Sequence, residues 1–182
     1  MTACPGQDQI TSCSCSRPAV AADNTVNANR ILFGPVKVPR PAVKLPADSG
    51  PVKILLAGEL ELIGYRVDAL PTVSRPLQLT LWWRGVRKLA EDWTAFFHLT
   101  PLSNGRELLG QMDQAITAHA YPPTVWSADE VVEDQVQISV ANLLAGRYAV
   151  WMGMYAPVTQ MRAGVGAGSG AAVDGPVLLV QF

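Results

Sequence analysis

The stretch Leu77-Gln78-Leu79-Thr80-Leu81-Trp82-Trp83-Arg84 decides the fold. Apolar side chains recur at every second position, as in a strand with one face in a core. The stretch Trp93–Leu99 shows the same alternation. Six further strands are predicted at Val52–Leu56, Glu59–Val67, Glu107–Gln114, Val136–Val140, Tyr148–Tyr155 and Pro176–Phe182. About eight strands at this spacing predict an all-β protein, an immunoglobulin-like antiparallel β-sandwich.

Turn and corner signals support this reading. Gly64 stands where the second strand switches face, which suggests a bulge. Asn104-Gly105 predicts a tight turn that makes a hairpin of the strands on either side. Tyr148, after Leu143-Leu144-Ala145-Gly146-Arg147, resembles the corner in which a tyrosine hydroxyl ties back to the upstream chain.

Two segments are predicted as loops. The region from Ala115 to Asp129 is expected to be ordered and pinned by Trp126. The region from Gly164 to Ala172 is expected to be a flexible, glycine-rich loop. It lacks the Lys-Ser/Thr ending of a phosphate-binding loop, so that reading is rejected.

Residues 1–50 differ in kind from residues 51–182, the predicted sandwich. They are rich in Pro, Ala, Ser and Asn, and their prolines favour extended segments over central strands. They bury too little apolar surface to offset their ordering entropy. We therefore expect an extended arm that orders against the sandwich or along a partner.

Composition narrows the classes of function. The 182 residues are 49% hydrophobic and 16% charged, with a formal net charge of −1. A nucleic-acid binder needs a basic cluster that this chain lacks. Apolar runs are also shorter than the roughly 18 residues of a membrane-spanning helix. So few charges on so apolar a chain suggest that other subunits cover part of its surface.

The three cysteines, Cys4, Cys13 and Cys15, all lie at the start of the chain. Cys4 could pair with either of the others, whereas the pair-of-pairs spacing of a metal site is missing. Met1-Thr2-Ala3-Cys4 resembles the end of a lipoprotein signal, although the preceding apolar stretch is absent. Cys4 is therefore either a lipidation site or an incidental cysteine in a disordered start.

No catalytic constellation emerges from the sequence. His98 and His119 lack a neighbouring acid, nucleophile or zinc-ligand spacing, so no metal, cofactor or enzymatic activity is predicted. Asp113, Glu130 and Asp134 could converge as a calcium site or carboxylate pair. The favoured reading is that they cap turns or accept backbone N–H bonds around Trp126.

Aromatic side chains give the best functional lead. Strand parity points Trp82, Phe96, Trp151 and Tyr155 out of the core, and they are the predicted partner-binding residues. The cover over such rings could be the arm, a partner protein or a stacked sugar. A sugar also needs convergent polar groups that the sequence does not place, so the arm or a protein partner is favoured.

The order of these features is similar to a family of bacterial β-sandwich domains. These domains form the extracytoplasmic C-terminal region of large membrane glycosyltransferase-like proteins, notably in Chloroflexota. The matching pieces are Ile63-Gly64-Tyr65, Leu79–Trp83, Phe96–Leu99, Gln111–Asp113, Pro123-Thr124, Trp126, Glu130–Val132, Asp134, Gly146–Tyr148 and Gly153–Pro157. The resemblance covers residues 52–182 and implies an accessory domain without established catalytic residues. We expect this chain to depart from the family in standing without the attached enzyme, and its loop from Val158 to Asp174 is longer.

The sequence therefore predicts a non-enzymatic accessory subunit of a larger, membrane-associated extracytoplasmic assembly. Its partners would be other protein subunits, with the membrane reached only through a tether or those partners. The alternative is a carbohydrate-binding sandwich. A hydrolase using Asp113 or Glu130 is the weakest hypothesis, because it needs a cleft that joins two acids.

Overall fold

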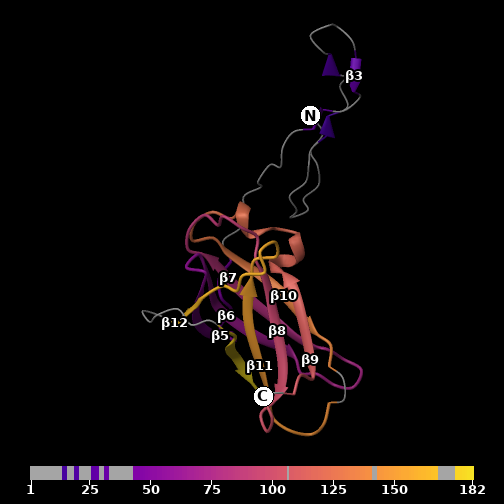
Figure 1. Cartoon of the computed structure of the whole chain (residues 1–182), viewed down its shortest axis with the longest axis vertical. Helices are drawn as coiled ribbons and strands as arrows, with labels where there is room; N and C mark the ends of the chain where they lie inside the picture. The colour runs from indigo at the N-terminus through magenta and orange to yellow at the C-terminus, as the bar shows by residue number, and fades with distance from the viewer. Residues whose placement is uncertain are drawn as a thin grey trace. The chain divides into compact units, whose positions relative to one another are not determined.

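The computed structural model describes residues 43–105, 107–140, 143–167 and 175–182, together with four short strands near the start of the chain (Figure 1). The chain forms two compact units, Met1–Pro41 and Ala42–Phe182. In the first unit, two antiparallel pairs join β1 to β4 and β2 to β3. These strands are β1 (Ser14–Cys15), β2 (Ala19–Val20), β3 (Val26–Ala28) and β4 (Ile31–Leu32). Cys4, the candidate lipidation site, lies outside the described residues, as does Cys13.

The second unit is all-β, as predicted, and its strands form two antiparallel sheets. The five-stranded sheet has the order β10-β7-β6-β5-β12. Its strands are β5 (Gly50–Leu56), β6 (Leu60–Ala69), β7 (Leu77–Gly85), β10 (Val131–Ile138) and β12 (Val165–Ala167).

The four-stranded sheet has the order β13-β11-β8-β9. Its strands are β8 (Thr94–Pro101), β9 (Gly110–Ala115), β11 (Tyr148–Tyr155) and β13 (Val177–Gln181). Figure 1 shows β11, β8 and β9 side by side in front, with β5, β6 and β7 behind them. The helical segments of the described chain are two short 3₁₀ turns, η1 (Ile116–His119) and η2 (Pro123–Val125), and neither is long or apolar enough to span a membrane.

The connections give the sandwich an immunoglobulin-like order. Strand β7 pairs with β10 in one sheet and β8 pairs with β11 in the other, and the chain crosses between sheets after β7, β9, β10, β11 and β12. At the crossing between β10 and β11 the Tyr148 hydroxyl donates a hydrogen bond to the Leu144 carbonyl. This is the predicted tyrosine corner, and it fixes the entry of β11 into its sheet.

The core follows the predicted alternation. Along β7 the side chains of Leu77, Leu79, Leu81 and Trp83 are at most 1% exposed. They face residues of the other sheet that are fully buried, namely Phe97, Leu99, Val150 and Met152. Removing this apolar surface from water is the main stabilising contribution to the two-layer fold.

Local predictions are confirmed at three positions. The pairing of β6 with β7 shifts register between Leu62 and Gly64, which is the predicted bulge. Strands β8 and β9 form the predicted hairpin. The loop before β10 is ordered around Trp126, which is 2% exposed and donates its indole N–H to the Tyr121 carbonyl at 2.9 Å.

The glycine-rich loop prediction is partly wrong. Within the expected flexible segment, Val165–Ala167 forms β12, whose residues pair with Ile54 to Leu56 of β5. The pairing satisfies backbone groups along the edge of β5 that would otherwise have no ladder partner. The following residues, 168–174, lie outside the described chain.

Candidate functional site

The outer face of the four-stranded sheet is the best candidate for a binding site. The strand register places His98 of β8 between Trp151 of β11 and Gln111 of β9. One pair further along, it places Phe96 between Gly153 and Asp113. Because side chains of paired residues share a face, aromatic and polar groups from three strands gather here.

Phe96 forms the floor of this face. A Cβ atom built on Gly153 would lie 2.3 Å from Phe96 Cζ, so the glycine leaves the space that the ring occupies across β11. The ring centroids of Phe96 and His98 are 5.2 Å apart. Phe96 is only 5% exposed, which makes it a support for the groups above it rather than a contact surface.

Tyr155 and Asp113 form a polar bridge across the strands. The Tyr155 hydroxyl donates to Asp113 Oδ2 at 3.1 Å. The Tyr155 ring also stacks on Phe96, with centroids 6.4 Å apart and planes 30° from parallel. Partial burial, followed by the neighbouring Asp113 carboxylate, raises the pKa of the Tyr155 phenol. The phenol therefore remains a neutral group held in a fixed orientation.

The segment after β11 folds back over the same face. The Ala156 N–H donates to the Met161 carbonyl at 2.9 Å, and the Gln160 N–H donates to the Ala156 carbonyl at 2.8 Å. This return brings Arg162 above the floor, with its guanidinium carbon 5.2 Å from the Phe96 ring centroid. A cation over a ring face is an attractive contact, so Phe96 helps to position the guanidinium.

Together these groups surround a depression of about 340 Å³. Its lining residues are Phe96, His98, Gln111, Asp113, Tyr155, Gln160 and Arg162. Trp151 lies on the same face beyond this lining, half-buried, and donates its indole N–H to Thr100 Oγ1 at 3.2 Å. The depression therefore combines ring surfaces with hydrogen-bond donors, acceptors and one permanent cation.

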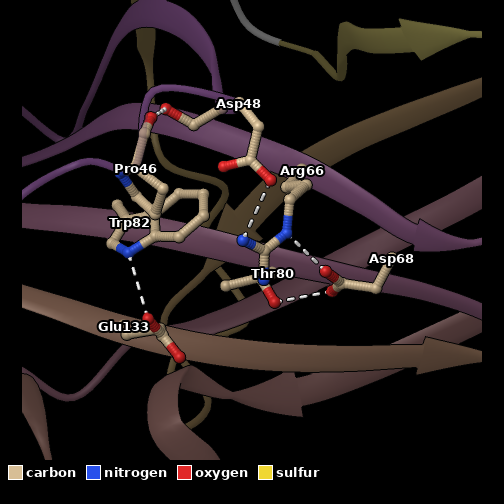
Figure 2. Close-up of polar contacts among 8 residues, drawn as sticks. Pro46, Asp48, Arg66, Asp68, Thr80, Trp82 and Glu133 are labelled. Carbon is tan, nitrogen blue, oxygen red and sulfur yellow. Dashed lines mark hydrogen bonds and ion pairs between the residues drawn. The ribbon is translucent and has the colours of Figure 1, made fainter.

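The outer face of the five-stranded sheet is organised differently around Trp82. Trp82 points away from the core, and its indole N–H donates to Glu133 Oε2 at 3.2 Å (Figure 2). The Arg66 guanidinium carbon lies 5.6 Å from the ring centroid. On the other side, Leu45 lies over Gly64, the residue paired with Trp82. As a result Trp82 is 0% exposed.

The covering segment, residues 43–48, is held by polar contacts that Figure 2 shows. Asp48 Oδ2 lies 3.5 Å from Arg66 Nη1, and Arg66 Nε donates to Asp68 Oδ1 at 2.6 Å. Thr80 Oγ1 donates to Asp68 Oδ2, also at 2.6 Å. These contacts link the covering segment to β6 and β7, so the cover belongs to the sandwich unit.

The four aromatic residues predicted to point outward and bind a partner differ in how far they are covered. Trp82 and Phe96 do point outward, but Trp82 is 0% and Phe96 is 5% exposed. Trp151 and Tyr155 are half-buried. Strand parity sets the direction of a side chain but not what lies above it. For Trp82, the cover is a piece of the chain's own predicted arm.

The three acids singled out from the sequence stay apart. Glu130 accepts from the Tyr121 hydroxyl and from the Ser127 N–H, both at 2.7 Å, as expected for an acid that orders the Trp126 loop. Asp113 lies on the outer face, whereas Asp134 is 6% exposed and points inward. His119 lies in η1. Within the described residues, no group of three His, Cys, Asp or Glu side chains is arranged to hold a metal ion.

Sequence reasoning missed Gln111, Gln160 and Arg162 as site residues. Gln111 shares strand parity with Asp113, so its position could have been found from the hairpin register. Gln160 and Arg162 lie in an irregular return whose path no periodicity predicts.

No protein-family model and no curated protein matches this chain.

Proposed function

We propose that the sandwich is a non-enzymatic carbohydrate-binding domain that holds its ligand on the outer face of the four-stranded sheet. The observation that carries this proposal is the depression of about 340 Å³, where polar side chains converge beside aromatic rings. These are the convergent polar groups whose positions the sequence did not reveal.

The chemistry of the lining matches a sugar ring. A sugar presents hydroxyl groups around its edge and C–H groups on its faces. Asp113 supplies acceptors, Gln111 and Gln160 supply both donors and acceptors, and the Tyr155 ring supplies an apolar surface. The volume lies near the lower end of ligand pockets, which suits one or two sugar units held within a longer chain.

A glycan array probed with the purified full chain tests this proposal. We expect binding that is lost in Tyr155→Ala and weakened at least about tenfold in Gln111→Ala, because each removes a lining group. Gln137→Ala is the matched control, since this exposed glutamine lines a depression on the other sheet. Absence of glycan binding by the folded wild-type chain, or equal loss in Gln137→Ala, would reject the proposal.

The second candidate is an accessory subunit of a membrane-associated extracytoplasmic assembly that docks other protein subunits on the same face. It is favoured by exposed apolar side chains near the depression. Val158 and Met161 in the folded-back segment are 92% and 68% exposed, and Leu178, which pairs with Trp151, is 39% exposed. Exposed apolar side chains of this kind suit a protein interface better than a sugar.

Native-mass and intact-mass analysis after gentle isolation from native membranes tests this second function. Fixed-stoichiometry partners that are lost in Met161→Asp would support docking, and added lipid mass on Cys4 would support a tether. A lone, unmodified monomer would count against both.

A further inference from the structure

We infer that the preferred ligand is an acidic sugar, a uronic acid unit whose carboxylate binds the Arg162 guanidinium. This inference rests on the proposed carbohydrate-binding function and names the class of sugar. It follows from the charge and the positioning of Arg162 within the depression.

Arg162 differs from three other arginines of the described chain in forming no ion pair there. Arg66, Arg84 and Arg87 each lie within 4.0 Å of a carboxylate oxygen on Asp48 or Asp68, Glu61 and Glu59, respectively. Among the described residues no such ion pair involves Arg162, although the side chain is exposed and lines the depression. An exposed guanidinium is suited to a carboxylate, which it can bind through two parallel hydrogen bonds.

The guanidinium is also positioned before any ligand binds. It lies over the face of Phe96, whose ring is fixed by the space at Gly153 and by stacking against Tyr155. The Arg162 backbone forms an isolated antiparallel bridge with Tyr155, which anchors the returning segment. Less conformational entropy is lost on binding when a long side chain is already held in this way.

The charges of the depression give an acidic sugar one orientation. Asp113, on β9, accepts from the Tyr155 hydroxyl and would repel a second carboxylate. Arg162, on the segment that follows β11, would attract it. An acidic sugar is therefore expected to turn its carboxylate toward Arg162 and its hydroxyl groups toward Asp113 and Gln111. A neutral sugar gains nothing comparable from Arg162.

Isothermal titration of the full chain with two oligosaccharides of equal length tests this inference. Trigalacturonate carries carboxylates, and galactotriose is the neutral probe. We expect trigalacturonate to bind about tenfold or more tightly, the effect of one charge-assisted hydrogen-bonded pair, and the preference to shrink as salt is raised. Tri-glutamate in a third arm separates a sugar carboxylate from a peptide carboxylate.

Arg162→Gln should remove the preference for trigalacturonate over galactotriose, because the guanidinium that binds the carboxylate is gone. Arg162→Lys should retain part of it, because the charge remains and the planar fork is lost. Arg75→Gln, a change at an exposed arginine whose Nε and Nη2 donate to the Leu70 carbonyl, is the matched control and should retain the full preference.

The outcomes separate this inference from the function on which it rests. Equal affinity for the two sugars, or a preference that survives Arg162→Gln, overturns the inference and leaves carbohydrate binding standing. Binding of tri-glutamate with neither sugar bound overturns both, as does a folded wild-type chain that binds none of the three probes.

Discussion

The two outer faces of the sandwich start from the same arrangement and end differently. On each, an aromatic side chain in mid-strand is paired with a glycine of the neighbouring strand, Trp82 with Gly64 and Phe96 with Gly153. Over Gly64 the apolar Leu45 fills the remaining space and closes the face. Over Phe96 the polar Arg162 lies beside an open depression.

The difference teaches that an outward aromatic residue does not make a binding site by itself. What decides is the segment that returns over it. Residues 43–48 present Leu45 and Pro46, whose half-buried side chains exclude water. The segment after β11 presents Gln160 and Arg162, which remain exposed and able to bind. The closed face therefore contributes to stability, and the open face is where we expect recognition.

The sharpest test of this contrast compares Trp82→Ala with Trp151→Ala. We expect Trp82→Ala to lower the free energy of unfolding by about 3–5 kcal/mol, because the whole ring is buried and a cavity would remain. Trp151 is half-buried on the open face, so its loss should cost only about 1 kcal/mol. Urea unfolding of both variants measures the difference.

Trp82→Phe is the control for this pair, since it keeps an aromatic ring and removes the N–H that donates to Glu133. It should recover more than half of the loss seen in Trp82→Ala. Equal losses in Trp82→Ala and Trp151→Ala would contradict the assignment of a closed and an open face.

Asp134 links the two sheets of the sandwich. Its Oδ1 on β10 accepts from Gln114 Nε2 on β9 at 3.2 Å. Burial raises the pKa of the Asp134 carboxyl from 3.8 to about 6, against the opposing effect of hydrogen bonds from Thr117, Gln135 and Gln114. The folded protein therefore holds a proton between pH 4 and 6 that the unfolded chain has released.

Because the folded state binds this proton more tightly than the unfolded chain does, the contribution of Asp134 to stability is present below about pH 4. It is lost as pH rises through about 6. The expected loss is on the order of 3 kcal/mol, at about 1.4 kcal/mol for each pH unit between the two pKa values. Urea unfolding at several pH values should show this fall in the wild-type protein and a flatter profile in Asp134→Asn. Identical profiles would exclude Asp134 as the cause.

The glycines beneath the two aromatic residues give a smaller effect. Gly153→Ala would place a Cβ 2.3 Å from Phe96 Cζ, so the ring must shift, at a cost of about 1–3 kcal/mol and with loss of ligand binding. In Gly64→Ala the closest atom is Leu45 Cδ2 at 2.6 Å, the end of a flexible side chain, so the cost should be lower. Thermal unfolding and glycan titration measure both effects.

Gly166→Ala in β12 is the neutral control, because the nearest atom to its added Cβ would be the Leu55 carbonyl oxygen at 3.8 Å, an ordinary contact. If Gly153→Ala were as well tolerated as Gly166→Ala, the floor of the open face would be more adaptable than its geometry indicates.

Much of the sandwich was predictable from the sequence because period-two alternation reports burial directly. The strand Tyr148–Tyr155 has its predicted bounds, and the tyrosine corner before it is present. Strand β12 was missed, because Val165–Ala167 has no alternation and is ordered by pairing with β5. Edge strands of this kind depend on a tertiary partner, which local sequence does not encode.

The candidate site was predictable only in part, for a related physical reason. Parity placed Phe96, Trp151 and Tyr155 on outer faces, and register adds Gln111 and Asp113. The position of Arg162 depends on hydrogen bonds that fold the segment after β11 back on itself. The cover over Trp82 likewise depends on contacts of Leu45 and Asp48 with residues far along the chain. Both are tertiary events without a periodic signal.

The smallest expected effect tests how the closed face stays closed. Asp48→Asn removes the ion pair with Arg66, whose side chains are 68% and 34% exposed, respectively. Exposed pairs of this kind are worth about 0–1 kcal/mol. The variant should therefore unfold almost like the wild-type protein, because apolar contact by Leu45 holds the segment.

Leu45→Ala removes that contact and should speed hydrogen exchange of the Trp82 indole N–H, measured by NMR, more than Asp48→Asn does. If Asp48→Asn alone gave fast exchange, the cover would depend on an exposed charge pair that salt can weaken. The closed face would then open more readily at high salt, and the contrast between the two faces would be one of degree.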